Sequence, residues 1–182
     1  MQEADDQTAH RLQLRDAVVA DAAALAFLNA ASWRAAYADV LPASYLAALE
    51  VDAWQERLRA RIDAADAAQF TLVACEGGSR LGLVSGGPAR SLPPSAEGEV
   101  YAIYVDPTCC GRGVGSALLG AAEARLTEAE CSHAALWVFT RNATARRFYE
   151  RRGWRLQPER RYWRRDGLCR QLVCYRKSFA SG

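Results

Sequence analysis

The chain has 182 residues, 51% of them hydrophobic and 24% charged, and its formal net charge is +2. This length and apolar content are enough for the core of one domain, so we expect a single domain over residues 1–182, with residues 1–9 as a flexible tail. No apolar run approaches the roughly eighteen residues that would span a membrane, and the acidic, polar start lacks the apolar stretch of a signal peptide. We therefore expect a cytoplasmic protein without a membrane partner.

The six cysteines form no Cys-x-x-Cys pair, and the chain has only two histidines. Zinc sites need such pairs or histidines nearby in the sequence. We therefore expect no metal site, and we expect reduced thiols that pack as small apolar groups. The cysteines concerned are Cys75, Cys109, Cys110, Cys131, Cys169 and Cys174.

The first half of the chain predicts a short strand, then helices, then a hairpin. Residues 11–15 are expected to form the first strand. Asp21 can cap a helix that extends to about residue 31, and residues 32–37 continue as a second helical piece. The pattern beyond them predicts helices over 44–49 and 52–65, strands over 70–75 and 81–85 joined through Gly77-Gly78, and a loop over 90–98.

The next stretch runs from a strand through a glycine-rich loop into a helix. Tyr101, Ile103 and Val105 alternate with smaller or polar neighbours and predict a strand over 99–105, which the following proline ends. The loop at 111–115 has glycine at alternate positions, and an apolar residue recurs every four positions in the helix after it. Unpaired N–H groups at the start of such a helix favour binding of a phosphate or pyrophosphate.

The loop matches neither of two common nucleotide-binding motifs. A P-loop needs a lysine directly after its last glycine, and the only lysine of this chain is Lys177. A dinucleotide-binding fold needs Gly-x-Gly-x-x-Gly in its first strand–helix–strand unit, whereas here Gly-x-Gly-x-Gly follows several earlier strands. The anion is therefore expected to belong to another class of ligand.

A second patterned block follows, and it completes the predicted sheet. A strand over 136–139 leads to Asn142 and a short helix that ends at a glycine. Two strands over 154–164 and 168–176 then pair through Asp166-Gly167, a strong hairpin signal. The whole pattern predicts a mixed α+β fold, in which a mostly antiparallel sheet is flanked by helices on both faces and one parallel pair comes from the strand–loop–helix–strand unit.

Together the two blocks resemble the GCN5-related N-acetyltransferase (GNAT) superfamily. The loop Cys110–Gly115 is similar to the family pattern Gln/Arg-x-x-Gly-x-Gly/Ala, and Asn142, Phe148-Tyr149 and Gly153-Trp154 are similar to its later block. Cys110 departs from the pattern, because the family usually has Gln or Arg there. The resemblance covers about residues 98–155 and implies a GNAT-like acyl-CoA N-acyltransferase fold, with acetyl-CoA as cosubstrate and no metal.

The resemblance also implies which residues bind the cosubstrate. In the family, backbone groups of the strand before the loop bind the pantetheine arm, the loop binds the pyrophosphate, and the asparagine contacts the arm or an ordered water. Asn142 can equally cap its helix, and Arg112 can equally be a solvent-facing loop residue. The implied cosubstrate-binding residues are Ile103, Tyr104, Val105, Gly111, Arg112, Gly113, Val114, Gly115, Ser116 and Asn142.

Two residues are candidates for proton transfer. By resemblance, Tyr149 is the acid that protonates the departing thiolate, and an ordinary phenol pKa of about 10 suits that role. Glu99, at the start of the strand that leads into the loop, is the candidate base for the incoming amine. Each has an alternative structural role, Tyr149 as an aromatic core residue and Glu99 as a strand-end carboxylate.

The resemblance implies that the acceptor enters between the first helices and the late hairpin. Trp33, Arg34 and Tyr37 are the candidate substrate-binding residues, although aromatic residues at helical spacing can equally belong to the core. Cations such as Arg34 and Arg90 favour an acceptor with a carboxylate or phosphate over a polyamine.

The resemblance implies an N-acetyltransferase that moves the acetyl group of acetyl-CoA directly, in a ternary complex, to a primary amine of a small molecule or a peptide N-terminus. One alternative is a non-catalytic acyl-CoA-binding regulatory module, against which Tyr149 and Glu99 argue. Another is nucleic-acid binding through residues 141–182, which carry 13 Arg and Lys against 3 acids. No aromatic or recognition-helix signature accompanies these charges, so we favour a solvated face. We expect a monomer or homodimer.

Overall fold

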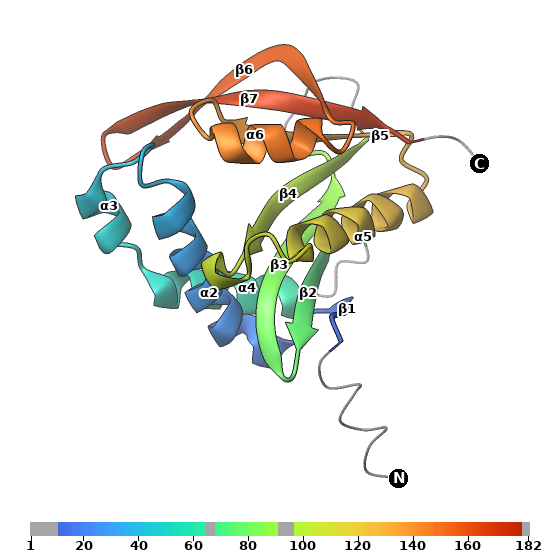
Figure 1. The fold of residues 1–182 in the computed structure, drawn as a ribbon, viewed down its shortest axis with the longest axis horizontal. Helices are drawn as coiled ribbons and strands as arrows, with labels where there is room; N and C mark the ends of the chain where they lie inside the picture. Colours follow the sequence, from blue (N-terminus) through green and yellow to red (C-terminus); the bar gives the residue numbers. More distant parts are fainter. Residues whose placement is uncertain (1–10, 65–67, 91–96, 180–182) are drawn as a thin grey trace.

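The computed structural model describes residues 11–64, 68–90 and 97–179. The expected tail at 1–9 and most of the expected loop at 90–98 lie outside the described residues. One seven-stranded sheet, in the order β1-β2-β3-β4-β5-β7-β6, forms the centre of the fold (Figure 1). Its strands are β1 Gln13–Asp16, β2 Phe70–Glu76, β3 Ser79–Pro88, β4 Gly98–Val105, β5 His133–Phe139, β6 Arg155–Arg165 and β7 Leu168–Ser178.

In the described part of the chain, five α-helices and two short 3₁₀ turns connect the strands. The 3₁₀ turns are η1 Val19–Asp21 and η2 Pro107–Cys109, and the helices are α2 Ala22–Ala36, α3 Ala43–Ala47, α4 Val51–Asp63, α5 Val114–Glu128 and α6 Ala143–Glu150. No helix among the described residues is both long enough and apolar enough to cross a bilayer.

The predicted fold class is confirmed. Every neighbouring pair of strands is antiparallel except β4 and β5, which the glycine-rich loop and α5 connect in parallel. The hairpin of β6 and β7 turns at Asp166 and Gly167, whose φ angles are 49° and 74°. Positive φ at both central residues suits the two-residue turns whose twist matches that of paired strands.

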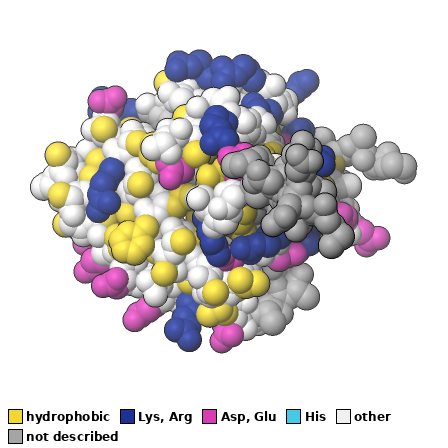
Figure 2. All heavy atoms as spheres, turned by 60° about the horizontal axis from the view of Figure 1, so that its bottom comes forward, with side chains coloured by type: hydrophobic (Ala, Val, Ile, Leu, Met, Phe, Trp, Pro, Cys, Tyr) yellow, Lys and Arg dark blue, Asp and Glu magenta, His cyan; other side chains and the backbone are white. Residues whose placement is uncertain are grey.

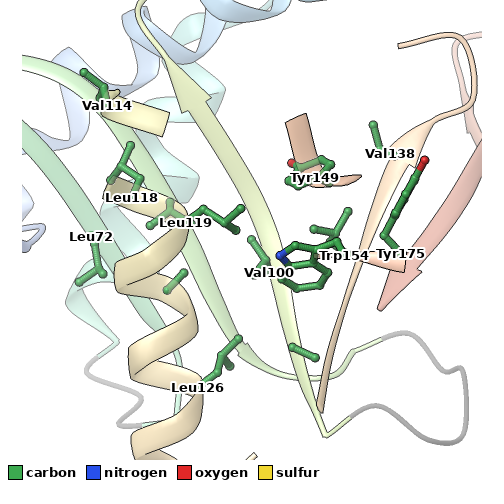
Figure 3. Packing of buried hydrophobic residues seen from close by; sticks show 14 of the residues in the cluster. Leu72, Val100, Val114, Leu118, Leu119, Leu126, Val138, Tyr149, Trp154 and Tyr175 are labelled. Atoms are coloured by element: carbon green, nitrogen blue, oxygen red, sulfur yellow. The ribbon is translucent and has the colours of Figure 1, made fainter. Parts of the chain in front are cut away.

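Helices cover both faces of the sheet. On one face, Leu118 and Leu119 of α5 pack with Val100 of β4 and with Trp154, which is 1% exposed (Figure 3). On the other face, α2 and α4 pack on β2 and β3 through a second buried cluster. Burial of these apolar stripes supplies the main stabilisation of the fold.

The first helical region differs from its prediction. Residues 22–36 form one continuous helix rather than two pieces. Asp21 precedes this helix but makes no side-chain cap. Its carboxylate, fully buried, instead accepts from Arg15 at 2.7 Å, Arg80 at 2.9 Å and the Val18 amide at 2.9 Å. These ion pairs join β1 and β3 to the start of α2.

A bulge in β4 also departs from the predicted alternation. Ser85 and Gly86 of β3 pair with Ala102 and Val100, so Tyr101 is an extra residue in β4. A bulge reverses the faces of the residues that follow it. Ile103 therefore packs on the same face as Val100, and Tyr104 packs on the α2 face.

We predict that Asp21→Asn lowers the free energy of unfolding by about 2–4 kcal/mol at pH 7, because two guanidinium groups lose their buried counter-charge. Arg15 holds the pKa of Asp21 well below its usual 3.8. The carboxylate therefore contributes fully above about pH 4, and its contribution is lost as the pH falls further. Urea denaturation followed by circular dichroism at pH 7 and pH 3 should show the difference from wild type shrinking at the lower pH.

Asp16→Asn is the matched control. Asp16 pairs with Arg125 at 2.7 Å but its side chain is 62% exposed, so we expect a change below about 1 kcal/mol. Equal effects of the two substitutions would contradict the role of the buried pairs.

Candidate active site

The sheet opens between β4 and β5. Gly98–Val100 pairs with Ala134–Leu136, but β4 continues to Val105 and β5 to Phe139 without further pairing between them. Beyond the parting, β4 stays paired with β3, and β5 stays paired with β7 along its whole length (Figure 1). From Ile103 to Val105, the edge of β4 that faces β5 therefore has no strand partner among the described residues.

The register identifies which backbone groups face this opening. The Asp106 amide donates to the Leu81 carbonyl at 2.8 Å, which makes that pair hydrogen-bonded. Hydrogen-bonded and non-hydrogen-bonded pairs alternate along an antiparallel ladder. Tyr104 is then bonded to β3, whereas the N–H and C=O groups of Ile103 and Val105 point away from β3, into the opening. Ile103, Tyr104 and Val105 were expected to bind the cosubstrate through backbone groups, and the geometry favours Ile103 and Val105.

The glycine-rich loop places the start of α5 beside the same opening. Gly111 and Gly113 both have φ of 84°, a left-handed conformation that glycine adopts without strain, and Gly113 caps α5 without any side-chain hydrogen bond. A Cβ atom on either would meet nothing within 4 Å. A Cβ atom on Gly115 would instead lie 3.5 Å from the Phe148 ring. The uncapped N–H groups and the clear space above the loop fit a pyrophosphate.

Side chains around the loop add positive charge. Arg112 extends to Glu76 of β2, at 2.5 Å, and to the Cys109 thiol, and this pairing raises its pKa further. Arg152, which the sequence analysis did not select, donates to the Ser116 hydroxyl in the first turn of α5. Its guanidinium also lies 4.2 Å from the Phe148 ring centre. A cation thus lies next to the expected pyrophosphate position.

Tyr149 lies between the two halves of the sheet. Its ring packs against Phe148, Trp154 and Tyr175, with centroid distances of 5.3 to 6.4 Å. Figure 3 shows Tyr149 with Trp154 and Tyr175. The Tyr149 hydroxyl makes no hydrogen bond with any other described residue, and the residue is 8% exposed. Burial, with Tyr104 nearby, raises the pKa of Tyr149 well above its usual value. The phenol is therefore protonated at neutral pH.

Hydrogen bonds fix the helix that carries Tyr149. The Asn142 side chain caps α6 by accepting from the Ala145 amide at 3.0 Å, so its capping role is present. The Tyr175 hydroxyl donates to Glu150 at 2.5 Å and accepts from Arg146 at 3.0 Å, and both partners are on α6. These contacts tie α6 to β7.

Glu99, the other proton-transfer candidate, is buried on the face of the sheet that α2 and α4 cover. Glu99 is 2% exposed, accepts from the Arg90 amide at 2.9 Å and lies 3.7 Å from the Arg90 guanidinium. The Arg90 guanidinium in turn stacks 3.4 Å from the Tyr101 ring centre. The carboxylate is thus an internal, cation-bound group rather than the exposed strand end that was the alternative.

The expected acceptor residues form an aromatic cluster with other side chains of this face. Trp33 contacts Tyr37, Trp54 and Trp163 at centroid distances of 4.9, 5.3 and 6.5 Å. Arg34 is exposed and donates from Nε to the Leu46 carbonyl at 3.2 Å, which joins α2 to α3. The cluster therefore has a structural role, and the Tyr104 side chain lies near Trp33 and Tyr37.

Two further arginines belong to the Glu99 side of the sheet, and the sequence analysis missed both. Arg61 of α4 reaches Ser85 of β3 at 3.5 Å. The Arg161 guanidinium, from β6, lies 4.5 Å from the ring centre of Trp137 in β5. Burial lowers the pKa of both arginines. The sequence holds a signal for Arg61 only. Its spacing from Trp54 and Leu58 places it on the inner side of the same helix.

No group of three or more His, Cys, Asp and Glu side chains is arranged to hold a metal within the described part of the chain. Cys110, at the start of the loop, is exposed and its thiol is free.

The chain is similar in sequence to known acetyltransferases. Residues 30–154 match the model of the Acetyltransferase (GNAT) family. The chain is 31% identical over 130 residues to YuaI, described as an uncharacterized N-acetyltransferase of Bacillus subtilis strain 168, an alignment that covers 71% of this chain and 72% of that protein. The chain belongs to the GNAT family of acetyltransferases, whose cosubstrate is acetyl-CoA.

Two solved structures show the same fold. The PaiA N-acetyltransferase from Thermoplasma acidophilum, in complex with coenzyme A, superposes with a TM-score of 0.75 at 18% identity, covering 93% of this chain and 99% of that one. YncA from Salmonella typhimurium, with its cofactor acetyl-CoA, gives a TM-score of 0.65 at 18% identity, covering 94% and 95%.

We predict that Gly113→Glu weakens coenzyme A binding at least about 100-fold, or 2.7 kcal/mol, because a carboxylate and a strained left-handed residue replace an open anion site. Isothermal titration calorimetry measures the affinity. Gly120→Glu adds the same group later in α5, where a Cβ also meets nothing within 4 Å, and should bind as wild type does. Wild-type affinity in Gly113→Glu would show that the loop does not hold the pyrophosphate.

Proposed function

We propose that this protein transfers the acetyl group of acetyl-CoA directly to a primary amine of a small molecule or a peptide N-terminus, in a ternary complex. The unpaired edge of β4, with Tyr149 and the start of α5 beside it, is the observation that supports this proposal most. An extended pantetheine arm can pair with that edge as an added strand. The acetyl-CoA thioester would then lie near the phenol.

Ile103 and Val105 are proposed to bind the arm through backbone groups, and the loop from Gly111 to Ser116 to bind the pyrophosphate. The Val105 N–H, which points into the opening, is proposed to donate to the thioester oxygen. An N–H fixed in a strand needs no reorganisation as negative charge develops on that oxygen. Asn142 is proposed to contact the arm while it caps α6, since a carboxamide has donors beyond the oxygen used in the cap.

Tyr149 is proposed to donate the proton that the departing thiolate takes up. Its raised pKa keeps the hydroxyl protonated, and no other described residue competes for its proton. The ring packing and the bonds of α6 to Tyr175 limit its motion. Such a fixed donor suits general acid catalysis.

Glu99 is proposed to accept the amine proton. Because the carboxylate is 2% exposed, the transfer needs the amine to enter beside β4 or a water between them. Neutral amine is the reactive form, and an aliphatic amine has an ordinary pKa of about 10.4, so a proton acceptor in this position promotes the reaction at neutral pH.

Nucleic-acid binding finds less support. Several arginines after residue 141 have internal partners, among them Arg146 with Tyr175 and Arg170 with the Val40 carbonyl. On the face drawn in Figure 2, several Arg and Lys side chains lie together along the upper edge, and the others lie among acidic and hydrophobic ones. The single-domain organisation over 1–182, the cytoplasmic location and the choice between monomer and homodimer stay predictions.

We predict that Tyr149→Phe lowers kcat about 100-fold or more, because the ring packing stays and only the donor is lost. An acceptor for this assay is first found by screening primary amines for free-thiol release with the wild-type protein. Calorimetry should show that Tyr149→Phe binds coenzyme A with nearly unchanged affinity. Tyr162→Phe, which removes the hydroxyl of a residue that is 53% exposed, is the matched control and should keep full turnover. Equal kcat in wild type and Tyr149→Phe would remove Tyr149 from the mechanism.

For Glu99→Gln, we predict that kcat/KM falls most at neutral pH and recovers toward high pH, where more of the amine is already neutral. The profile from pH 6 to pH 10 measures this. A loss of the same size at every pH would mean that Glu99 positions the acceptor, and no loss would leave it a purely structural carboxylate.

A further inference from the structure

The first turn of α5 has a charge pattern that is unusual for the start of a helix. The N–H groups at that end carry a partial positive charge, so acidic side chains are favoured there and cations are not. No acidic residue lies in the first turn of α5. Arg152, which follows α6, instead donates from its guanidinium to the Ser116 hydroxyl in that turn. A positive side chain therefore lies against the positive end of the helix.

Packing between α6 and α5 holds the Arg152 side chain in this position. The Arg152 amide donates to the Tyr149 carbonyl at 2.9 Å, which ties the residue to the end of α6. Its guanidinium lies 4.2 Å from the centre of the Phe148 ring, within the range of a cation–π contact. A Cβ atom on Gly115 would lie 3.5 Å from the same ring, so Phe148 also packs against the start of α5. The half-buried guanidinium is thus fixed on both helices.

No carboxylate neutralises Arg152 within the described ranges. None of the ion pairs there includes it, and a single hydroxyl is the only acceptor that its guanidinium reaches. Glu123 of α5 pairs with Lys177, and Glu150 of α6 accepts from the Tyr175 hydroxyl. A guanidinium has several N–H donors, so most of those of Arg152 are available to a ligand.

The other cation beside the glycine-rich loop is already paired. Arg112 lies 2.5 Å from the Glu76 carboxylate, so its charge is compensated within the protein. Arg152 is therefore the cation at the start of α5 whose charge the described carboxylates leave uncompensated. A pyrophosphate brings negative charge and many acceptor oxygens, and guanidinium groups bind phosphates strongly.

We propose that Arg152 donates to the pyrophosphate of the cosubstrate, together with the backbone N–H groups of the glycine-rich loop. The phosphate oxygens take up its available donors, and their charge removes the repulsion between the guanidinium and the start of α5. Arg152 thereby joins cosubstrate binding to α6, the helix that carries Tyr149. The inference rests on the pyrophosphate site proposed above and adds to it a residue from outside the loop.

Truncated cosubstrates test this inference, because they lack defined phosphate groups. Isothermal titration calorimetry measures the affinity of the full-length protein for coenzyme A, for dephospho-coenzyme A, which lacks only the 3′-phosphate, and for pantetheine, which lacks all phosphates. Arg152→Gln should weaken binding of both nucleotides about tenfold or more and leave pantetheine binding nearly unchanged. Arg152→Lys keeps the charge without the planar fork of donors and should lose less affinity.

Arg155→Gln is the matched control. Arg155 is an exposed arginine at the start of β6, so this substitution removes the same charge from a nearby surface. All three affinities should stay as in the wild type. An equal loss of nucleotide affinity in Arg155→Gln and Arg152→Gln would reduce the effect to net charge and overturn the inference.

Three other outcomes of the titrations also overturn the inference. A loss confined to coenzyme A would place Arg152 at the 3′-phosphate instead of the pyrophosphate. A loss of the same size for pantetheine would mean that Arg152 only supports the local structure. Wild-type affinity of Arg152→Gln for both nucleotides would mean that the guanidinium does not reach the phosphates.

These titrations need no acceptor amine, so they separate the inference from the proposed function. Selective loss of nucleotide affinity in Arg152→Gln, with no amine acetylated by the wild type, would sustain the inference and remove the proposed transfer. Acetylation of an amine, with unchanged nucleotide affinity in Arg152→Gln, would sustain the transfer and overturn the inference.

Discussion

The parting of β4 and β5 after three residue pairs is the constraint on which the rest of the structure depends. It leaves backbone N–H and C=O groups of Ile103 and Val105 without strand partners inside the sheet. Unpaired backbone groups away from bulk water cost free energy, so a fold that retains them gains from a ligand with the complementary pattern. An extended chain of amides, such as a pantetheine arm, has that pattern, which supports the proposal that the arm binds in this opening.

Once the sheet has parted, other contacts must hold its two halves together. Trp154, which follows α6, donates from its indole N–H to Glu123 of α5 at 2.8 Å, and Lys177 of β7 pairs with the same carboxylate at 2.7 Å. Glu123 thus links the helix packed on β4 to the half that contains β5 and β7. The position of Tyr149, five residues before Trp154, is set by this bridge as well as by α6 itself.

The local motifs could be predicted from the sequence, but the bulge in β4 and the arginines on the Glu99 side of the sheet could not. Local signals predicted the glycine loop, the Asn142 cap and the hairpin at Asp166-Gly167, because a turn or cap depends on a few adjacent residues. The bulge at Tyr101 had no such signal, since it is a property of the pairing with β3. Arg61 and Arg161 are a hundred residues apart, and only the tertiary fold brings them to one face.

The bulge determines which side chains of β4 lie on each face of the sheet. In a regular strand, Val100 and Ile103 would face opposite sides, and Tyr104 would share the side of Val100. With Tyr101 inserted, Ile103 joins the core under α5, and Tyr104 joins Glu99 on the α2 face. In the proposed function, side chains of β4 would thus line the acceptor site while its backbone edge would bind the cosubstrate. A single extra residue would then let both reactants use one strand, because one needs its side chains and the other needs its backbone groups.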